Sequence, residues 1–176
     1  MNIDKQKVFL VDDSLSTLDQ GEALLERYFD VMTMGCAKKL FEILEKITPD
    51  IILLDVMMPE MDGFETIKIL KADPRWRDIP VMFLTGKNDS ESESLGFALG
   101  AVDYIVKPFS GPLLQKRIAN QISHRKLQTA IKDYSVNYED TLREIVITSN
   151  KLQRMISALP PGMLPPEFGG ETPEKG

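Results

Sequence analysis

The 176-residue sequence is poor in the residues that mark several protein classes. It has one cysteine, Cys36, and one histidine, so it cannot form an internal disulfide and lacks the ligands of a zinc site. No apolar run approaches the ~18 residues that a membrane span needs. The N-terminus also lacks the apolar stretch and small-residue cleavage site of a secretory signal. We therefore expect a cytoplasmic protein that makes no contact with a membrane.

Positive charge is scarce in the first two-thirds of the chain. Residues 1–112 carry 20 Asp and Glu against 12 Lys and Arg, whereas residues 113–159 carry 4 against 8. Nucleic-acid binding depends on clustered Lys and Arg that release counterions from phosphates. The one basic stretch, 116–132, is more simply a solvated helix face, and no helix-turn-helix pattern follows residue 125. We therefore expect no direct DNA binding.

Glycine and proline divide the chain into three parts. Residues 113–159 contain neither, which predicts one helix about 70 Å long at ~1.5 Å per residue. Residues 160–176 hold five prolines and four glycines, which predicts an irregular, disordered tail. We expect a folded domain over 1–125, a helical stalk over 126–159 and a tail over 160–176.

The first 112 residues alternate strand signals with helix signals. Strands are predicted over Val8–Val11, Val31–Met34, Ile51–Leu54, Val81–Leu84 and Val102–Val106. Amphipathic helices are predicted over Leu15–Phe29, Lys38–Ile47, Phe64–Ala72 and Glu91–Leu99, and a further helix begins near Pro112. Three of the strands are continuously apolar, as expected of strands buried on both faces of a parallel sheet. The pattern predicts an α/β fold, a doubly wound (βα)5 sandwich around a five-stranded parallel sheet.

Polar side chains follow the predicted strands where a doubly wound sheet binds its ligands, beyond the carboxyl ends. They are Asp12, Asp13, Asp55, Thr85 and Lys107. Singly, each is more often structural, and Ser14 or Asp13 could simply cap the first helix. Together they predict a site, because three converging carboxylates repel one another and need positive charge. Lys107 can supply it, and so can a divalent metal, for which oxygen-only ligands favour Mg²⁺ or Mn²⁺.

Four stretches carry a resemblance to a known family. They are VFLVDDS at 8–14, PDIILLDVMMPEMDGFE at 49–65, IPVMFLTG at 79–86 and GAVDYIVKPF at 100–109. In order and spacing they resemble the receiver domain of two-component response regulators over residues 5–125. The resemblance implies a flavodoxin-like fold and a phosphorylation-dependent switch. It implies no enzymatic activity other than self-phosphotransfer and autodephosphorylation. The implied partner is a sensor histidine kinase or a phosphotransfer protein.

The resemblance assigns the acidic residues to phosphoryl transfer. Asp55 matches the phosphoacceptor. Asp12 and Asp13 match the acidic pair that positions Mg²⁺, Asp13 as a direct ligand and Asp12 mostly through water. Asp55 would hold the same metal. The backbone carbonyl of Met57 would complete the protein ligands.

The remaining matches concern the switch. Lys107 matches the lysine that pairs with Asp55 and then with its phosphoryl oxygens, and the Lys107–Pro108 bond would be cis. Thr85 matches the hydroxyl that turns inward to bond the phosphoryl group, and Tyr104 matches the aromatic residue that rotates inward with it. Together they would change the surface of the last α/β units.

Several residues receive no chemical role. Gly63, after Asp62, is expected to permit the backbone geometry of a turn. Cys36 and Trp76 are assigned to packing or surface. His124 is interpreted as a helix residue rather than as a phosphodonor.

A heptad pattern runs along the stalk. Its a positions are Ile131, Tyr138, Ile145, Leu152 and Leu159, and its d positions are Leu127, Tyr134, Thr141, Thr148 and Met155. This predicts a parallel two-stranded coiled coil and a homodimer, with a bent helical hairpin folded back on the first domain as the alternative. The stretch RIANQISHRKL at 117–127 resembles the linker of regulators with cyclic-dinucleotide or phosphatase output domains. It implies a missing output domain or a downstream output protein.

Two other functions compete with the switch. One is a constitutive docking or dimerisation module in which phosphorylation is not used. The other is an enzyme or cofactor protein, such as a flavin carrier or an aspartyl phosphatase. The adjacent Asp12 and Asp13 would repel the bare phosphate of a flavin. A phosphatase needs a second acid two positions after its nucleophile, where this chain has Ser14 or Leu15.

Overall fold

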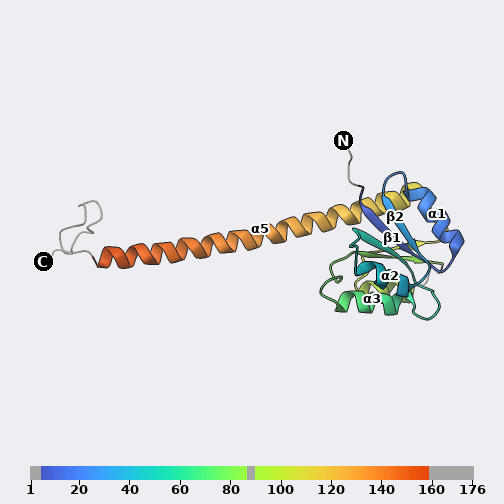
Figure 1. Ribbon diagram of the computed structural model, residues 1–176, viewed down its shortest axis with the longest axis horizontal. Helices are drawn as coiled ribbons and strands as arrows, with labels where there is room; N and C mark the ends of the chain where they lie inside the picture. The colour runs from blue at the N-terminus through green and yellow to red at the C-terminus, as the bar shows by residue number, and fades with distance from the viewer. Residues whose placement is uncertain (1–4, 87–89, 159–176) are drawn as a thin grey trace. The chain divides into compact units, whose positions relative to one another are not determined.

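The computed structural model describes residues 5–86 and 90–158, with the side chains of 90–92 left aside. Five parallel strands form one sheet in the order β2-β1-β3-β4-β5 (Figure 1). The strands are β1 (Lys7–Val11), β2 (Asp30–Met34), β3 (Ile51–Asp55), β4 (Val81–Thr85) and β5 (Asp103–Val106). The helices are α1 (Leu15–Leu25), α2 (Ala37–Leu44), α3 (Gly63–Ala72), α4 (Ser90–Ala98) and α5 (Gly111–Ser157). The predicted doubly wound (βα)5 fold is confirmed.

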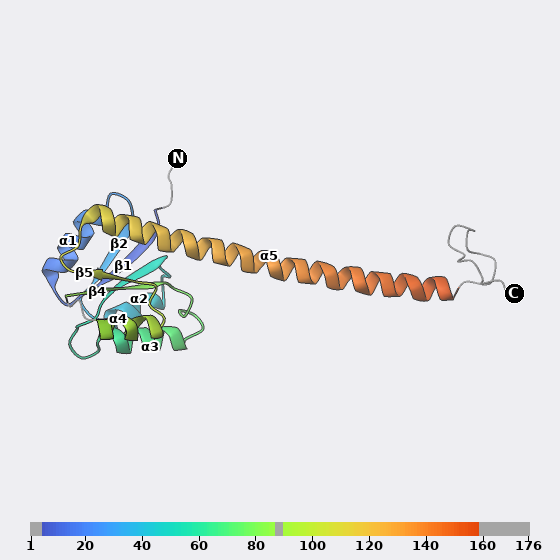
Figure 2. The same cartoon turned by 180° about the vertical axis from the view of Figure 1, so that it is seen from behind.

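Helices cover both faces of the sheet, because successive strand residues point to opposite faces. Phe9 and Val11 pack in a core with α2 and α3, whereas Val8 and Leu10 pack in a second core with α1 and the first turns of α5. Figure 2 shows the strands between these two layers, with α4 on the side of α2 and α3. Ile118 and Ile122 of α5 are buried in the second core. Both faces of the sheet are therefore apolar, as the continuous strand patterns require.

Two helices end earlier than predicted. The expectation that a helix reaches Phe29 is wrong, because α1 ends at Leu25 and the amides of Tyr28 and Phe29 both donate to the Leu25 carbonyl in a turn. Phe29 is nevertheless buried, so the apolar pattern continues past the helix that it indicated. Similarly, α2 ends at Leu44, and the amide of Ile47 closes a turn on Ile43.

The start of α1 is capped by Ser14 rather than by Asp13. The Ser14 hydroxyl accepts a hydrogen bond from the Thr17 amide, and its backbone is extended, as an N-cap requires. This choice leaves the Asp13 carboxylate available for other contacts. The helix therefore begins directly beside the predicted site, where the Ser14 amide donates a hydrogen bond to Asp12.

One uninterrupted helix, α5, extends from Gly111 to Ser157. A helical hairpin needs a break, so the hairpin alternative is wrong for these residues. The chain divides into two units, Met1–Leu127 and Gln128–Gly176. Leu159 and the tail predicted over 160–176 lie outside the described residues. Within the described ranges, no helix combines the length and apolarity needed to cross a membrane.

Candidate functional site

The predicted site residues come together at one edge of the sheet. Asp12 follows β1, Asp55 ends β3, Thr85 ends β4 and Lys107 follows β5. These four strands are neighbours and run in parallel, so their carboxyl ends meet. The amide of Lys107 also donates to the Thr85 carbonyl at 2.8 Å, which ties the ends of β4 and β5 together.

Three carboxylates form a compact cluster at this edge. One oxygen from each of Asp12, Asp13 and Asp55 lies within 4.8 Å of the others. Asp12 is fully buried and Asp55 is 4% exposed, whereas Asp13 faces solvent. Oxygen-only donors with one open side fit a hard cation such as Mg²⁺, which retains some of its water. Met57 is 67% exposed; because its thioether is too soft a ligand for Mg²⁺, only its main-chain carbonyl could contribute to such a site.

Lys107 bridges the two buried carboxylates. Its ammonium donates to Asp55 Oδ1 at 2.7 Å and forms a second, short ion pair with Asp12 Oδ2. The other Asp12 oxygen accepts the Ser14 amide at 2.9 Å. Both carboxylate oxygens of Asp12 therefore have a hydrogen-bond donor, and the Lys107 ammonium lies between the carboxylates of Asp12 and Asp55. The Lys107–Pro108 peptide bond is cis.

Burial and charge act in opposite directions on the pKa values of this cluster. Burial raises the pKa of Asp55, and together with the charges of Asp12 and Asp13 it outweighs the hydrogen bond and the charge of Lys107, which act to lower that pKa. Burial acts to lower the pKa of Lys107, but its hydrogen bonds to Asp12 and Asp55 outweigh burial and raise that pKa. Lys107 therefore stays charged at neutral pH and remains the fixed cation of the cluster.

Gly63 packs directly against the backbone of Asp55. A Cβ at this position would contact the Asp55 carbonyl oxygen and lie 2.9 Å from the Val56 Cα. The expectation that Gly63 permits an unusual backbone is wrong: its φ is not positive, and the reason for glycine is this close approach. Asp62, the N-cap of α3, instead forms a capping box with Glu65.

Tyr104 is buried beside the site, in the layer under α4. Its ring lies 5.2 Å from that of Phe83 and 5.5 Å from that of Phe97. Gly96 of α4 makes room for it, since a Cβ there would lie 2.7 Å from the Tyr104 Cζ. Sequence reasoning missed this contact, although a glycine within a predicted helix is a signal that something packs closely.

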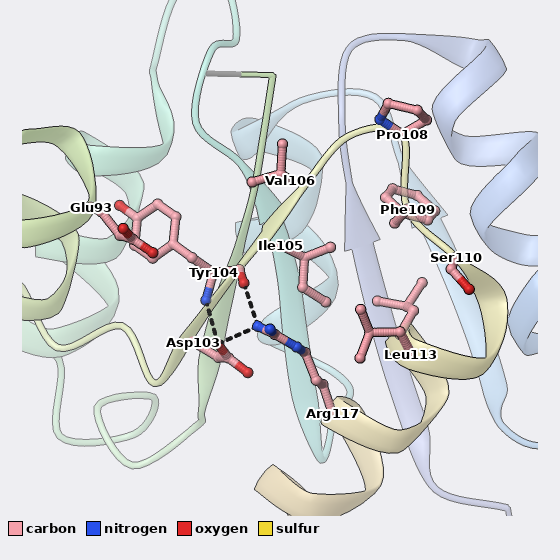
Figure 3. Close-up of a pocket in the computed structure, with 11 residues that line it drawn as sticks. Glu93, Asp103, Tyr104, Ile105, Val106, Pro108, Phe109, Ser110, Leu113 and Arg117 are labelled. Atoms are coloured by element: carbon pink, nitrogen blue, oxygen red, sulfur yellow. Dashed lines mark hydrogen bonds and ion pairs between the residues drawn. The ribbon is translucent and has the colours of Figure 1, made fainter. Parts of the chain in front are cut away.

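A cavity of ≈ 580 Å³ lies between α4, β5 and α5. Figure 3 shows Arg117 on its floor, where one guanidinium nitrogen donates to Asp103 at 2.8 Å and to the Tyr104 carbonyl at 2.7 Å. Glu93 and the Tyr104 ring lie on its other side. Arg117 thus fixes the backbone of the predicted switch residue to α5, and nothing in the sequence signalled it.

Trp76, Cys36 and His124 are not members of the carboxylate cluster. Trp76 is buried, packs 5.6 Å from the Phe41 ring and lies under Arg75, which confirms its assignment to packing. Cys36 is half-buried at the start of α2. His124 is exposed on α5.

Comparison with known proteins agrees with this geometry. Residues 8–119 match the sequence pattern of the response regulator receiver domain. A probable cyclic di-GMP phosphodiesterase from Vibrio cholerae is 40% identical over 86% of this chain and 34% of its own length. The DNA-binding response regulator MtrA of Mycobacterium tuberculosis is 33% identical over 67% of this chain and 51% of its own length. The chain therefore spans about a third of the first relative and about half of the second.

Solved structures share the fold. The chemotaxis protein CheY4 of Vibrio cholerae superposes with a TM-score of 0.63 at 31% identity, over 66% of this chain and 98% of that one. The carboxylate cluster and Lys107 of this chain lie in its first unit, Met1–Leu127. With the family pattern covering 112 of 176 residues, the chain belongs to the receiver domains of two-component response regulators.

Proposed function

We propose that this chain is a phosphorylation-dependent signalling switch that accepts a phosphoryl group on Asp55. The observation that carries the proposal is the carboxylate cluster at the strand ends, with Lys107 between Asp12 and Asp55. Receiver domains receive their phosphoryl group from histidine kinases or phosphotransfer proteins, so we assign the donor to a phosphohistidine on such a partner. Over residues 1–125 the chain serves as the receiver domain.

The chain's own residues account for most of the chemistry. An Asp55 oxygen attacks phosphorus, the phosphorus–nitrogen bond of the donor histidine breaks, and an acyl phosphate forms. Such transfer depends on positioning and on neutralising the charge of the phosphoryl oxygens. Lys107, held 2.7 Å from Asp55, is placed to move its hydrogen bond onto those oxygens. Asp12, Asp13, Asp55 and the Met57 carbonyl would hold Mg²⁺, or Mn²⁺, which supplies further positive charge.

We propose that Thr85 and Tyr104 convert phosphorylation into a change of surface. The new group adds roughly −1.5 to −2 charges beside the end of β4, where the Thr85 side chain is buried. The Lys107 amide donates a backbone hydrogen bond to Thr85, and Tyr104 lies on β5, the strand that Lys107 directly follows. A shift of Thr85 toward the phosphoryl group would therefore reach the Tyr104 ring and the cavity beside Arg117 (Figure 3). Such a coupled movement would provide the two-state element that a switch requires.

We propose that the helical stalk, over 126–159, dimerises the chain and transmits the switch to an output. The phosphodiesterase relative aligns over 86% of the chain, about 151 of 176 residues, whereas the first unit holds only 127. The similarity therefore continues into the stalk. The output would be a downstream protein or a further domain, and the chain itself would act on no separate substrate and bind no DNA. We assign it to the cytoplasm.

Mass spectrometry of the intact protein tests the phosphoacceptor. Incubated with Mg²⁺ and acetyl phosphate, the chain should gain one phosphoryl group, and should gain none after chelation of the metal. Asp55→Asn should gain none, whereas Asp30→Asn, at an exposed position on β2, should gain one like the parent. Absence of phosphorylation of the folded parent by several donors would favour the constitutive docking or dimerisation module instead.

A further inference from the structure

The stalk part of α5 exposes a long row of apolar side chains. All residues from Lys126 to Ala158 are exposed in the single chain. The row runs from Leu127 to Ile156, and its apolar members are 43% to 73% exposed. We call it the apolar stripe, made of Leu127, Ile131, Tyr134, Tyr138, Leu142, Ile145, Leu152 and Ile156. A helix of this length with an unpartnered apolar face needs a partner to cover that face.

Helix geometry places the whole stripe on one narrow face. At 3.6 residues per turn these eight residues fall within an arc of about 80°, and Ser149, between Ile145 and Leu152, lies on the same arc. Every charged residue between Leu127 and Ile156 lies at least about 100° from the centre of that arc. No charged residue therefore lies on the face of the stripe along about 44 Å of helix, although a few exposed apolar residues, Val136, Val146, Ile147 and Met155, lie outside it.

The stripe does not follow the strict heptad pattern. A repeat of seven places Thr141, Thr148 and Met155 at the interface, and on a straight helix these positions drift about 20° further away with each heptad. The exposed residues instead step by three and four, with one double step of four from Tyr134 through Tyr138 to Leu142. The apolar row therefore contains an eleven-residue repeat, between Tyr134 and Ile145, in place of a heptad.

We propose that the stalks of two copies of this chain pair through the apolar stripe, parallel and in register. In this dimer the eleven-residue repeat replaces the heptad register after Tyr138. The inference rests on the dimerisation in the proposed function and names its contact residues. The stripe advances 29 residues in eight turns, about 3.6 per turn, so the paired helices would run nearly straight there. A second copy offers an identical uncharged face. Parallel pairing also puts Leu127 of both chains, where each stalk leaves its receiver unit, at the same end.

Cysteine cross-linking tests the register residue by residue. In full-length Cys36→Ser, which removes the only native thiol, single cysteines replace Tyr138, Leu142, Ser149, Leu152 or Ile156 in turn. Each should form a disulfide-linked dimer on mild oxidation, because paired Cα atoms must lie within about 7 Å.

The matched controls are the heptad positions and the opposite face. Thr141→Cys, Thr148→Cys and Met155→Cys should cross-link much less than their stripe neighbours, and Ile147→Cys should not cross-link. Efficient cross-linking at 141, 148 and 155 but not at 142, 149 and 156 would overturn the eleven-residue repeat while leaving the dimer intact. Cross-linking at a single position would show antiparallel pairing, since only one residue then meets its own copy. No cross-linking anywhere, with a monomeric mass by light scattering, would refute the proposed dimer itself.

Paired substitutions give an independent readout without thiols. Leu142→Asn should weaken the dimer at least about tenfold, measured by sedimentation, because it buries a polar group in the interface. Thr141→Asn and Ile147→Asn, which place the same amide outside the stripe, should each change the dissociation constant less than about threefold. Equal weakening by Leu142→Asn and Ile147→Asn would contradict the assignment of this face.

Discussion

Replacing Lys107 with methionine tests whether its ammonium compensates the buried carboxylates. The ammonium lies 2.7 Å from Asp55 Oδ1 and also pairs with Asp12, which is fully buried. Methionine keeps the apolar stem of the side chain but leaves both carboxylates without their cation. Removing one partner of a buried ion pair costs about 3–5 kcal/mol. We expect a loss of this size at pH 7.5 without Mg²⁺, a large part of the ~5–15 kcal/mol of a typical domain.

Urea unfolding followed by Trp76 fluorescence measures this loss. Trp76 is the single tryptophan and is buried in the core, so its emission reports on unfolding of the first unit. Lys39→Met is the matched control, because Lys39 pairs with Glu42 where both side chains are more than half exposed. That control should change the unfolding free energy by less than about 0.5 kcal/mol.

A second substitution checks the cause. Asp12→Asn in the Lys107→Met background removes the most buried unpaired charge and should recover at least about 1 kcal/mol, a non-additive effect expected of groups in direct contact. Saturating Mg²⁺ should also recover part of the loss, because the cation binds only the folded cluster. A Lys107→Met protein that unfolds within about 1 kcal/mol of the parent at pH 7.5 would refute the compensating role of the ammonium.

Three further perturbations follow from the same geometry. Because burial raises the pKa of Asp55, the folded parent gains stability as pH falls toward that pKa. Asp55→Asn removes the buried charge and should therefore stabilise the metal-free protein by about 1–2 kcal/mol at pH 7.5. The gain should be smaller at pH 5, and urea titrations at both pH values measure it. Gly63→Ala should cost about 1–3 kcal/mol, because its Cβ meets the Asp55 backbone, whereas Gly35→Ala, with nothing within 4 Å, should cost less than about 1 kcal/mol in thermal unfolding. Gly96→Ala should displace the Tyr104 ring, seen as shifts of its aromatic NMR signals; unchanged signals would contradict the close contact.

The position of the site could be predicted because strand patterns are local. The apolar runs end directly before Asp12, at Leu54 before Asp55 and at Leu84 before Thr85, and in a parallel sheet the ends of neighbouring strands must meet. Their order in the sheet, with β1 between β2 and β3, follows from the doubly wound architecture rather than from any single residue.

Contacts between distant segments could be predicted only in part. The resemblance implied that Lys107 pairs with Asp55, but spacing did not indicate its second ion pair, with Asp12, 95 positions away. Nor did it indicate the hydrogen bond from Arg117 to the Tyr104 carbonyl, 13 positions away. The end of α1 differs from its prediction for a related reason. Phe29 is apolar because it packs in the core from a turn, and an apolar residue in a turn extends a helical pattern without extending the helix.

Chemical trapping of the phosphorylated residue tests the central claim most directly. Borohydride reduces the carbonyl of an acyl phosphate to an alcohol with loss of phosphate, so a phosphorylated aspartate becomes homoserine. After incubation with Mg²⁺ and acetyl phosphate, reduction and peptide mass spectrometry, we predict homoserine at position 55 and unmodified aspartate at 12 and 13. Homoserine at position 12 or 13 would contradict the account. So would the absence of homoserine from all three positions in protein whose intact mass shows phosphorylation.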